Sequence, residues 1–331
     1  MKIFIVGLGS AGRRHLKNLL AIGIPEEDII LIRSGKSTLP DGELSKFHTE
    51  YNLEKALKMY RPNIVIISNP TSLHMDSAIS SGRCGAHIFI EKPISNSFDK
   101  LDELLRIIER EKKLVYVGFQ YRFHPGLKFV KDLMHSREIG EIIHVEVHWG
   151  EFLPSWHPWE DYRKSYAARK ELGGGVTLTL CHPFDYLRWL VGDVQSVYAD
   201  IRNTGKLDID VDDLANITLK FTSGATGTVH LNYLQKPKSH WIEIVGENET
   251  VRWEDDSGRV QVYKNGTWHN YSFNYERNAI FLDEMKHFLA CVEGKEKPKV
   301  SIEDGIEALR IALAAKKSSV EKRLIELEEV R

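Results

Sequence analysis

The sequence of 331 residues has few cysteines, no marked excess of charge of either sign and no long apolar run. Cys84, Cys181 and Cys291 lie far apart and form no Cys-x-x-Cys pair, which argues against a disulfide framework or a structural zinc site. Lys and Arg number 45 against 47 Asp and Glu, so charge gives no sign of a nucleic-acid or membrane partner. No apolar stretch reaches the roughly 18–20 residues that a membrane span needs. We expect a soluble cytoplasmic protein without a metal centre.

The strongest local motif is a glycine-rich turn near the N-terminus. Ile3–Val6 is an apolar run typical of a buried strand, and it leads directly into a Gly-x-Gly-x-x-Gly pattern. Gly7 would permit the tight turn, Gly9 would let the backbone approach a pyrophosphate, and Gly12 would let the next helix lie close on the strand. That helix N-terminus offers N–H groups and a positive dipole end to phosphates. The pattern predicts a dinucleotide-binding turn rather than a purely structural one.

Two kinds of pattern divide the chain. In the first third, short apolar runs alternate with amphipathic helices, which indicates a parallel sheet covered on both faces with its ligand crevice at the strand ends. After about Gly118, short alternating strands joined by tight turns indicate a large, mostly antiparallel sheet. We expect an α/β Rossmann dinucleotide-binding domain over residues 1–121 and an α+β domain for substrate binding and oligomerisation over residues 122–331. The last helix is expected to pack back on the first domain.

Six motifs follow one another along the chain. They are Gly7–His15 (GLGSAGRRH), Asn69–His74 (NPTSLH), Glu91–Ser95 (EKPIS), Val117–Pro125 (VGFQYRFHP), Ile139–Ile142 (IGEI) and Gly173–Gly192 (GGGVTLTLCHPFDYLRWLVG). In their order and spacing the chain resembles the Gfo/Idh/MocA oxidoreductases, named for glucose–fructose oxidoreductase and inositol dehydrogenase. Residues 157–166 resemble a branch met in surface-sugar and polysaccharide pathways. The resemblance covers nearly the whole chain and implies an NAD(P)-dependent dehydrogenase or reductase of a sugar or nucleotide sugar.

The resemblance implies Lys92 and His182 as catalytic residues. Lys92 follows the fourth predicted strand, and in relatives this lysine helps bind the nicotinamide ribose and the reacting substrate oxygen. A cation at that oxygen would stabilise the developing alkoxide. The Lys92–Pro93 bond is either cis or trans. The family's histidine at His182 gives or takes the proton of the substrate hydroxyl, which suits a group that titrates near neutral pH.

The proton relay departs from the family pattern. Many members carry an aspartate one helical turn before the histidine, but here Leu178 and Thr179 occupy the candidate positions. The nearest acid is Asp185, three residues after His182 and on the same helical face. Asp185 binds a substrate hydroxyl, orients the imidazole, or only stabilises the start of the helix.

Arg33 bears on the choice of cofactor. A site that prefers NAD usually has an acid about 20 residues beyond the glycine motif. Here that strand ends in Arg33-Ser34-Gly35-Lys36, whose groups suit a 2′-phosphate and therefore predict NADP. The alternative is NAD, with Arg33 stacked on the adenine; His74 likewise either lies near the nicotinamide or only starts a helix. The predicted cofactor-binding set is Gly7, Gly9, Ser10, Ala11, Gly12, Arg33, Ser34, Lys36, Asn69, Thr71, His74, Glu91 and Lys92.

Aromatic and guanidinium side chains are predicted to bind the substrate. They suit a sugar, especially one that carries a carboxylate, phosphate or nucleotide, although surface aromatics also pack subunit contacts. The predicted substrate-binding set is Tyr121, Arg122, Trp156, Tyr162, Arg163 and Asp185. Two other functions stay open: redox-assisted sugar elimination or glycoside cleavage with tightly bound NAD, and cofactor-dependent regulation without turnover. A broad sheet with one face to cover predicts a homodimer or homotetramer.

Overall fold

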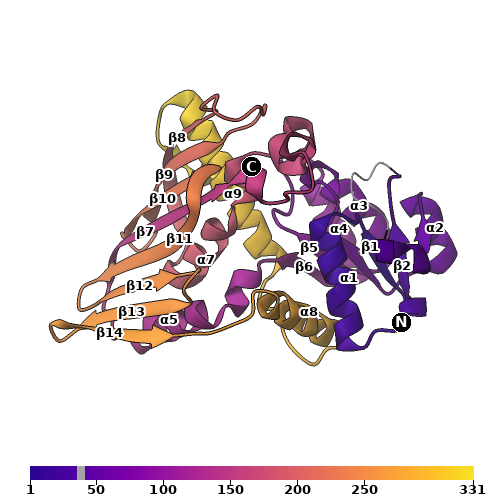
Figure 1. Ribbon diagram of the computed structural model, residues 1–331, viewed down its shortest axis with the longest axis horizontal. Coiled ribbons are helices and arrows are strands. Elements are labelled where there is room, and N and C mark those ends of the chain that lie inside the picture. The colour runs from indigo at the N-terminus through magenta and orange to yellow at the C-terminus, as the bar shows by residue number, and fades with distance from the viewer. Residues whose placement is uncertain (36–41) are drawn as a thin grey trace. The chain divides into compact units, whose positions relative to one another are not determined.

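The computed structural model describes residues 1–35 and 42–331, which form two compact units (Figure 1). Unit 1 comprises residues 1–119, 171–173 and 281–306, and unit 2 comprises residues 120–170, 174–280 and 307–331. Lys36, which the sequence predicts to bind the cofactor, lies outside the described residues. Each unit has its own sheet, and the sheets differ in kind as the sequence predicts.

Unit 1 is built on sheet A, six parallel strands in the order β3-β2-β1-β4-β5-β6. This is the Rossmann order, in which the direction of winding reverses between β1 and β4 and a ligand crevice forms at the carboxyl ends of those strands. The strands are β1 Ile3–Val6, β2 Ile29–Ile32, β3 His48–Glu50, β4 Ile64–Ile67, β5 His87–Glu91 and β6 Val115–Gly118. The helices before residue 120 are α1 Ser10–Ile22, α2 Leu53–Tyr60, α3 His74–Arg83 and α4 Leu101–Glu111.

The core of unit 1 explains its apolar strand sequences. Every residue of β1, β2, β4 and β6 is buried, because a parallel sheet with helices on both faces leaves no strand face to solvent. Residues 281–306 add to this core: the ring of Phe288 lies 5.4 Å from Phe89 and 5.7 Å from Tyr116. A segment nearly 200 positions later in the sequence therefore completes the first unit.

Unit 2 is built on sheet B, nine strands in the order β14-β13-β12-β11-β7-β10-β9-β8-β15. All neighbouring pairs are antiparallel except β7 and β10, which run parallel. The predicted fold class is therefore confirmed. Of the helices within the described ranges, none is both long and apolar enough to cross a bilayer. The strands are β7 Ile142–Phe152, β8 Val194–Arg202, β9 Leu214–Phe221, β10 Thr226–Asn232, β11 Leu234–Gly246, β12 Thr250–Glu254, β13 Arg259–Lys264, β14 Thr267–Ser272 and β15 Ile325–Glu326, and the remaining helices are α5 Pro125–Ser136, α6 Val176–Thr179, α7 His182–Val191, α8 Ala279–Val292 and α9 Ile302–Glu321.

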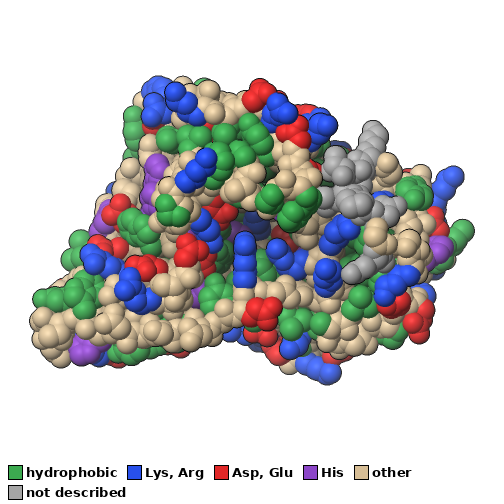
Figure 2. Space-filling view, in the orientation of Figure 1, with side chains coloured by type: hydrophobic (Ala, Val, Ile, Leu, Met, Phe, Trp, Pro, Cys, Tyr) green, Lys and Arg blue, Asp and Glu red, His purple; other side chains and the backbone are tan. Residues whose placement is uncertain are grey.

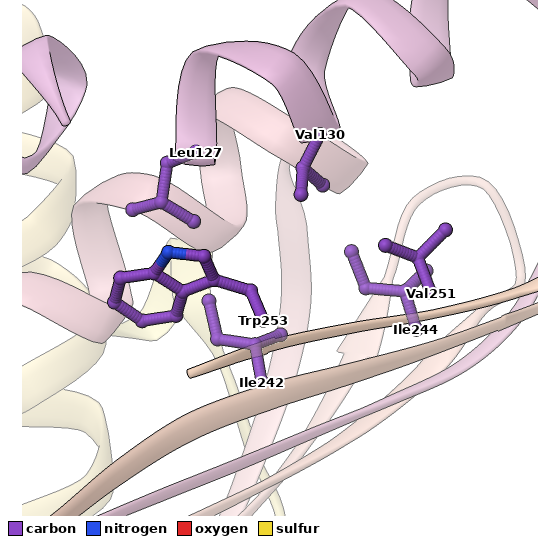
Figure 3. A pocket seen from close by; sticks show the side chains of 6 residues that line it. All are labelled: Leu127, Val130, Ile242, Ile244, Val251 and Trp253. Atoms are coloured by element: carbon purple, nitrogen blue, oxygen red, sulfur yellow. The ribbon is translucent and has the colours of Figure 1, made fainter. Parts of the chain in front are cut away.

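One face of sheet B packs against helix α5. Figure 3 shows two side chains of α5 pointing toward an apolar group on the sheet. Trp253 is only 1% exposed there, and a Cβ on Gly126 would lie 2.8 Å from its indole nitrogen, so the helix lies directly on this ring. The side chains that line the small pocket between helix and sheet are Leu127 and Val130 of α5 and Ile242, Ile244, Val251 and Trp253 of the sheet.

The opposite face of sheet B is polar and aromatic. Along β7, buried residues alternate with more exposed ones, as expected for a strand with only one face in the core. Figure 2 shows histidine side chains on the surface of this part of the molecule. His148 stacks on His230 at 4.9 Å between ring centroids and on Trp241 at 5.6 Å. This face therefore carries an ordered row of rings.

Helix α9 closes the outer edge of sheet B. The strand β15 pairs with β8 through Ile325 and Glu326 only. Farther along β8, the backbone N–H of Ala199 donates to the hydroxyl of Ser318 at 3.0 Å, and that of Ile201 donates to Ser319 at 2.8 Å. Two serines thus satisfy edge groups that would otherwise be a template for another strand.

Candidate active site

The turn between β1 and α1 has the shape that a dinucleotide needs. Gly7 has a φ of +88°, and a Cβ there would lie 2.5 Å from the backbone nitrogen of Asn69. A Cβ on Gly12 would lie 2.0 Å from the carbonyl oxygen of Gly7. A Cβ on Gly9, by contrast, would meet no described atom within 4 Å. Two glycines are thus required by internal packing, and the third leaves open space at the N-terminus of α1, where a pyrophosphate fits.

The carboxyl ends of β2 and β4 adjoin this turn. The N–H of Gly7 donates to the carbonyl of Ile32 at 3.0 Å, and the hydroxyl of Ser68 donates to the carbonyl of Gly7 at 2.8 Å. Arg33 directly follows β2 and is half-buried, while Ser34 is exposed. Arg33 therefore stands beside the glycine turn, at the strand end where a ribose-binding acid would otherwise lie.

The segment after β4 is held by its own hydrogen bonds. The amide of Asn69 donates to the hydroxyl of Ser77 at 2.9 Å, and Thr71 is buried at the start of a short 3₁₀ turn. His74 opens α3 with 1% exposure, and its two ring nitrogens each lie 2.9 Å from a backbone carbonyl oxygen, of Asn69 and of Pro93. The His74 ring therefore contacts two loops of the protein and does not reach the surface.

The segment Glu91-Lys92-Pro93 follows β5 at the same edge of sheet A. Lys92 is half-buried, and the Lys92–Pro93 bond is cis. The carboxylate of Glu91 lies 2.8 Å from Nε2 of His15 on α1. Burial by itself raises the pKa of Glu91, but the hydrogen bond to His15 and the charges of His15, Lys92 and Arg14 outweigh it, so the pKa is lowered. Glu91 is thus a carboxylate surrounded by basic side chains.

In unit 2, Arg122 and Asp185 are bound to each other. The guanidinium Nε and Nη2 donate to the two carboxylate oxygens at 3.0 and 2.6 Å. The side chains are 7% and 1% exposed. A bidentate pair of this kind is strong and specific in geometry. The charged groups that the sequence predicts as substrate ligands therefore satisfy one another within the unit.

His182 is the first residue of α7 and is 3% exposed. Its Nε2 lies 3.2 Å from the amide nitrogen of Gln120, and its ring packs edge-on against Tyr121 at 5.0 Å. One helical turn earlier, Leu178 and Thr179 are both buried. In unit 2 the imidazole thus packs against the amide of Gln120 and against aromatic rings.

A buried cluster centred on Asp255 lies beside these rings. Asp255 accepts hydrogen bonds from Tyr121 at 3.0 Å, Lys238 at 3.1 Å and Tyr275 at 2.9 Å, and it lies 3.3 Å from His240. Burial raises the pKa of Asp255, but His240, Lys238 and Tyr275 hold it well below its ordinary value. Burial, followed by the Asp255 charge, raises the pKa of Tyr121 well above its ordinary value. Asp255 is therefore a fixed anion that anchors Tyr121.

Trp149 links the Asp255 cluster to His182. Its ring stacks on His240 at 4.0 Å and on His182 at 5.6 Å, and its indole N–H donates to Glu151 at 2.8 Å. Sequence reasoning missed this ring stack. The strand patterns of β7 and β11 mark Trp149 as buried but do not indicate which residues it faces, because that depends on strand register.

The loop after β7 holds the other predicted substrate residues. Arg163 is exposed and pairs with Asp161 at 2.8 Å, while Trp156 is half-buried and packs edge-on against Tyr233 at 5.5 Å. Trp156 and Tyr162 line a cavity of about 10 Å³. A space of that size holds a single water molecule. This cavity is therefore too small for a sugar, and Arg163 lies at the surface of the loop.

Comparison with known proteins shows similarity over both units. Residues 1–119 match the model of the oxidoreductase family with an NAD-binding Rossmann fold, and residues 127–252 match the GFO/IDH/MocA C-terminal domain. The chain is 29% identical to myo-inositol 2-dehydrogenase of Thermotoga maritima, in an alignment that covers 100% of this chain and 99% of that relative. Among solved structures, the WlbA dehydrogenase of Bordetella pertussis with NADH and UDP-GlcNAcA aligns with a TM-score of 0.83 at 21% identity, covering 98% of both chains. A levoglucosan dehydrogenase with NADH and levoglucosan aligns with a TM-score of 0.84 at 18% identity, covering 99% of both chains. These two likenesses show the fold.

Proposed function

The chain belongs to the Gfo/Idh/MocA family of NAD-binding oxidoreductases, and we propose that it is a dehydrogenase or reductase of a sugar, cyclic polyol or nucleotide sugar. The observation that carries the proposal is the arrangement at the edge of sheet A. Gly9, with open space beside it, follows β1, and the half-buried Lys92 follows β5. Both strands belong to the parallel sheet A, so the two residues lie at its carboxyl edge. A nucleotide site and a reactive cation on one edge suit redox chemistry at a carbon–oxygen bond.

Lys92 and His182 are the catalytic residues in this proposal. A bound nicotinamide would supply the acceptor or donor of the hydride. The Lys92 ammonium would donate a hydrogen bond to the reacting oxygen and stabilise the negative charge that develops there. The His182 imidazole would hold or release the hydroxyl proton, with Gln120 and Tyr121 fixing its ring. Asp185 is bound to Arg122, so we assign this pair to the support of α7 rather than to the proton.

The substrate class rests on the relatives. Myo-inositol, levoglucosan and UDP-GlcNAcA appear in the names of similar proteins, and each is a ring with secondary hydroxyls. The test is a panel of these three compounds with NAD⁺ and NADP⁺, followed by nicotinamide absorbance. We expect reduced nicotinamide with at least one compound. A protein that binds the cofactor tightly but reduces none of it with any member of a broad sugar panel would contradict the proposal.

We further propose that NADP is preferred. The support is that Arg33, and no carboxylate, follows β2 beside the glycine turn. A guanidinium there would donate to a 2′-phosphate, whereas NAD-preferring sites usually place an acid at this position. The cofactor-binding set under this proposal is Gly7, Gly9, Ser10, Ala11, Gly12, Arg33, Ser34, Asn69, Thr71, Glu91 and Lys92, with Lys36 added from the sequence alone. His74, which the sequence also predicts for this set, is assigned instead to the support of the loops, because both of its ring nitrogens lie against backbone carbonyls.

The assembly is proposed to be a homodimer or homotetramer built through residues 122–331. The support is the polar and aromatic face of sheet B, where Tyr198 is 46% exposed and His148 stacks with Trp241. Exposed rings on a broad sheet face are typical of an interface with two-fold symmetry. Light scattering that shows a monomer at micromolar concentration would contradict the proposed assembly.

We also propose a cytoplasmic location, because Cys84, Cys181 and Cys291 are all free thiols.

A further inference from the structure

Two buried histidines contact the segment Glu91-Lys92-Pro93 from different helices. His15, on α1, is 1% exposed and lies 2.8 Å from the carboxylate of Glu91. Its ring packs edge-on against Phe89 on β5, with 5.0 Å between centroids. Glu91, the residue before Lys92, is therefore held by a charge-assisted hydrogen bond to an imidazole whose ring is itself packed against Phe89.

The residue after Lys92 is fixed from the other side. His74, on α3, is also 1% exposed, and its Nδ1 lies 2.9 Å from the carbonyl oxygen of Pro93. Its Nε2 lies 2.9 Å from the carbonyl oxygen of Asn69, in the loop after β4. His74 therefore ties the segment that carries Lys92 to the neighbouring strand end, beside the glycine turn.

We propose that His15 and His74 act together as positioning residues that place the ammonium group of Lys92, an inference that rests on the proposed catalytic role of Lys92. A lysine ends in a flexible four-carbon stem, so the position of its charge depends on the backbone that carries it. Here both neighbours of Lys92 are held by rigid, buried imidazoles. Catalytic groups lose much of their effect when displaced by about 1 Å, so such support has a kinetic consequence.

The sharpest test is a double-mutant cycle between His15→Leu and Lys92→Ala. Acting through Lys92, His15→Leu should lower kcat by about 10–100-fold in the wild-type background and by less than about twofold when Lys92 is already alanine. The cofactor dissociation constant should change by less than about threefold, because the glycine turn is untouched. His15→Gln, which keeps a side-chain donor, should recover part of the loss. His74→Leu and His74→Gln should behave as the corresponding His15 variants do.

The control is His87→Gln. His87 is the first residue of the same strand β5, where its Nδ1 accepts a hydrogen bond from the Leu114 N–H at 3.2 Å. The His87→Gln variant should be less stable than the wild type but should keep its kcat.

A second readout needs no substrate. Acylation of Lys92, followed by peptide mass spectrometry, should become faster in His15→Leu, while the exposed Lys17 on α1 reacts at an unchanged rate.

The outcomes separate the two proposals. If Lys92→Ala turns over normally, the catalytic assignment fails, and the positioning role fails with it. If Lys92→Ala is impaired but His15→Leu and His74→Leu lower kcat by the same factor in the wild-type and Lys92→Ala backgrounds, only the positioning role is overturned. An unchanged labelling rate of Lys92 in both His15→Leu and His74→Leu would also overturn the positioning role.

Discussion

Replacing Gly9 with alanine should separate cofactor binding from stability. The backbone of Gly9 has φ −71° and ψ −164°, which an alanine adopts without strain, and a Cβ there meets no described atom within 4 Å. The folded protein should therefore lose only the difference between glycine and alanine at a helix N-cap, about 1 kcal/mol or less. In a chain of this size that shifts Tm by only about 2 °C. The new methyl group would instead occupy the space that a pyrophosphate needs.

Cofactor binding should weaken strongly in the same variant. Loss of one charge-assisted hydrogen bond costs about 1.5–3 kcal/mol, which corresponds to about a 10–100-fold increase in Kd. Fluorescence titration of NADPH and NADH measures the change in Kd, and thermal unfolding measures the change in stability. Gly23→Ala is the matched control, because Gly23 ends α1 with φ +96° and should lose stability with unchanged Kd. Wild-type cofactor affinity in Gly9→Ala would refute the placement of the pyrophosphate.

Three further variants test other parts of the account. Wild-type protein should bind NADPH about 10–100-fold more tightly than NADH, and Arg33→Ala or high salt should close the gap; equal or tighter NADH binding in the wild type would refute the NADP preference. Asp185→Asn should lower the free energy of unfolding by about 3–5 kcal/mol, because it removes the negative charge from a buried, bidentate pair with Arg122; unchanged stability with a raised KM would instead indicate a substrate contact. Burial lowers the pKa of His124 from 6.5 to about 4, so the unfolded state takes up the proton before the folded state does as the pH falls from 6.5 to 4. His124 should therefore lower the free energy of unfolding by roughly 3 kcal/mol over this range, and His124→Asn should lack this contribution. Equal pH slopes for wild type and His124→Asn in chemical unfolding would contradict this.

The sequence was sufficient where local chemistry decides the structure. Gly7 and Gly12 were predictable because a tight strand-to-helix turn excludes side chains, and the apolar runs of sheet A were predictable because both of its faces are covered. The polar β3 and the two-residue β15 were not predicted. These strands exist because a neighbouring strand offers hydrogen bonds, and their own sequences carry little strand pattern.

The contacts around the candidate residues were beyond the sequence. Asp255 meets Tyr121 across 134 positions of chain. The pairing of β11 with β12 places Asp255 beside His240, and nothing in the sequence shows that Tyr121 reaches the same point. Arg122 and Asp185 were predicted individually as substrate ligands, but no sequence pattern shows that two opposite charges 63 positions apart bind each other. His15 lies three residues after Gly12, the last glycine of the motif, and this short spacing was the signal that could have drawn attention to it.

The central claim is that Lys92 serves hydride chemistry at a carbon–oxygen bond, and one measurement tests it most directly. It is the single-turnover rate of nicotinamide reduction by a substrate from the sugar panel, at saturating cofactor, in Lys92→Ala and in Lys100→Ala. Lys100 is an exposed partner of Asp76 on the same segment of chain and serves as the control. The account predicts a loss of about 10²–10⁴-fold in this rate for Lys92→Ala, a much smaller change in cofactor Kd, and a wild-type rate for Lys100→Ala. A wild-type rate in Lys92→Ala would contradict the account.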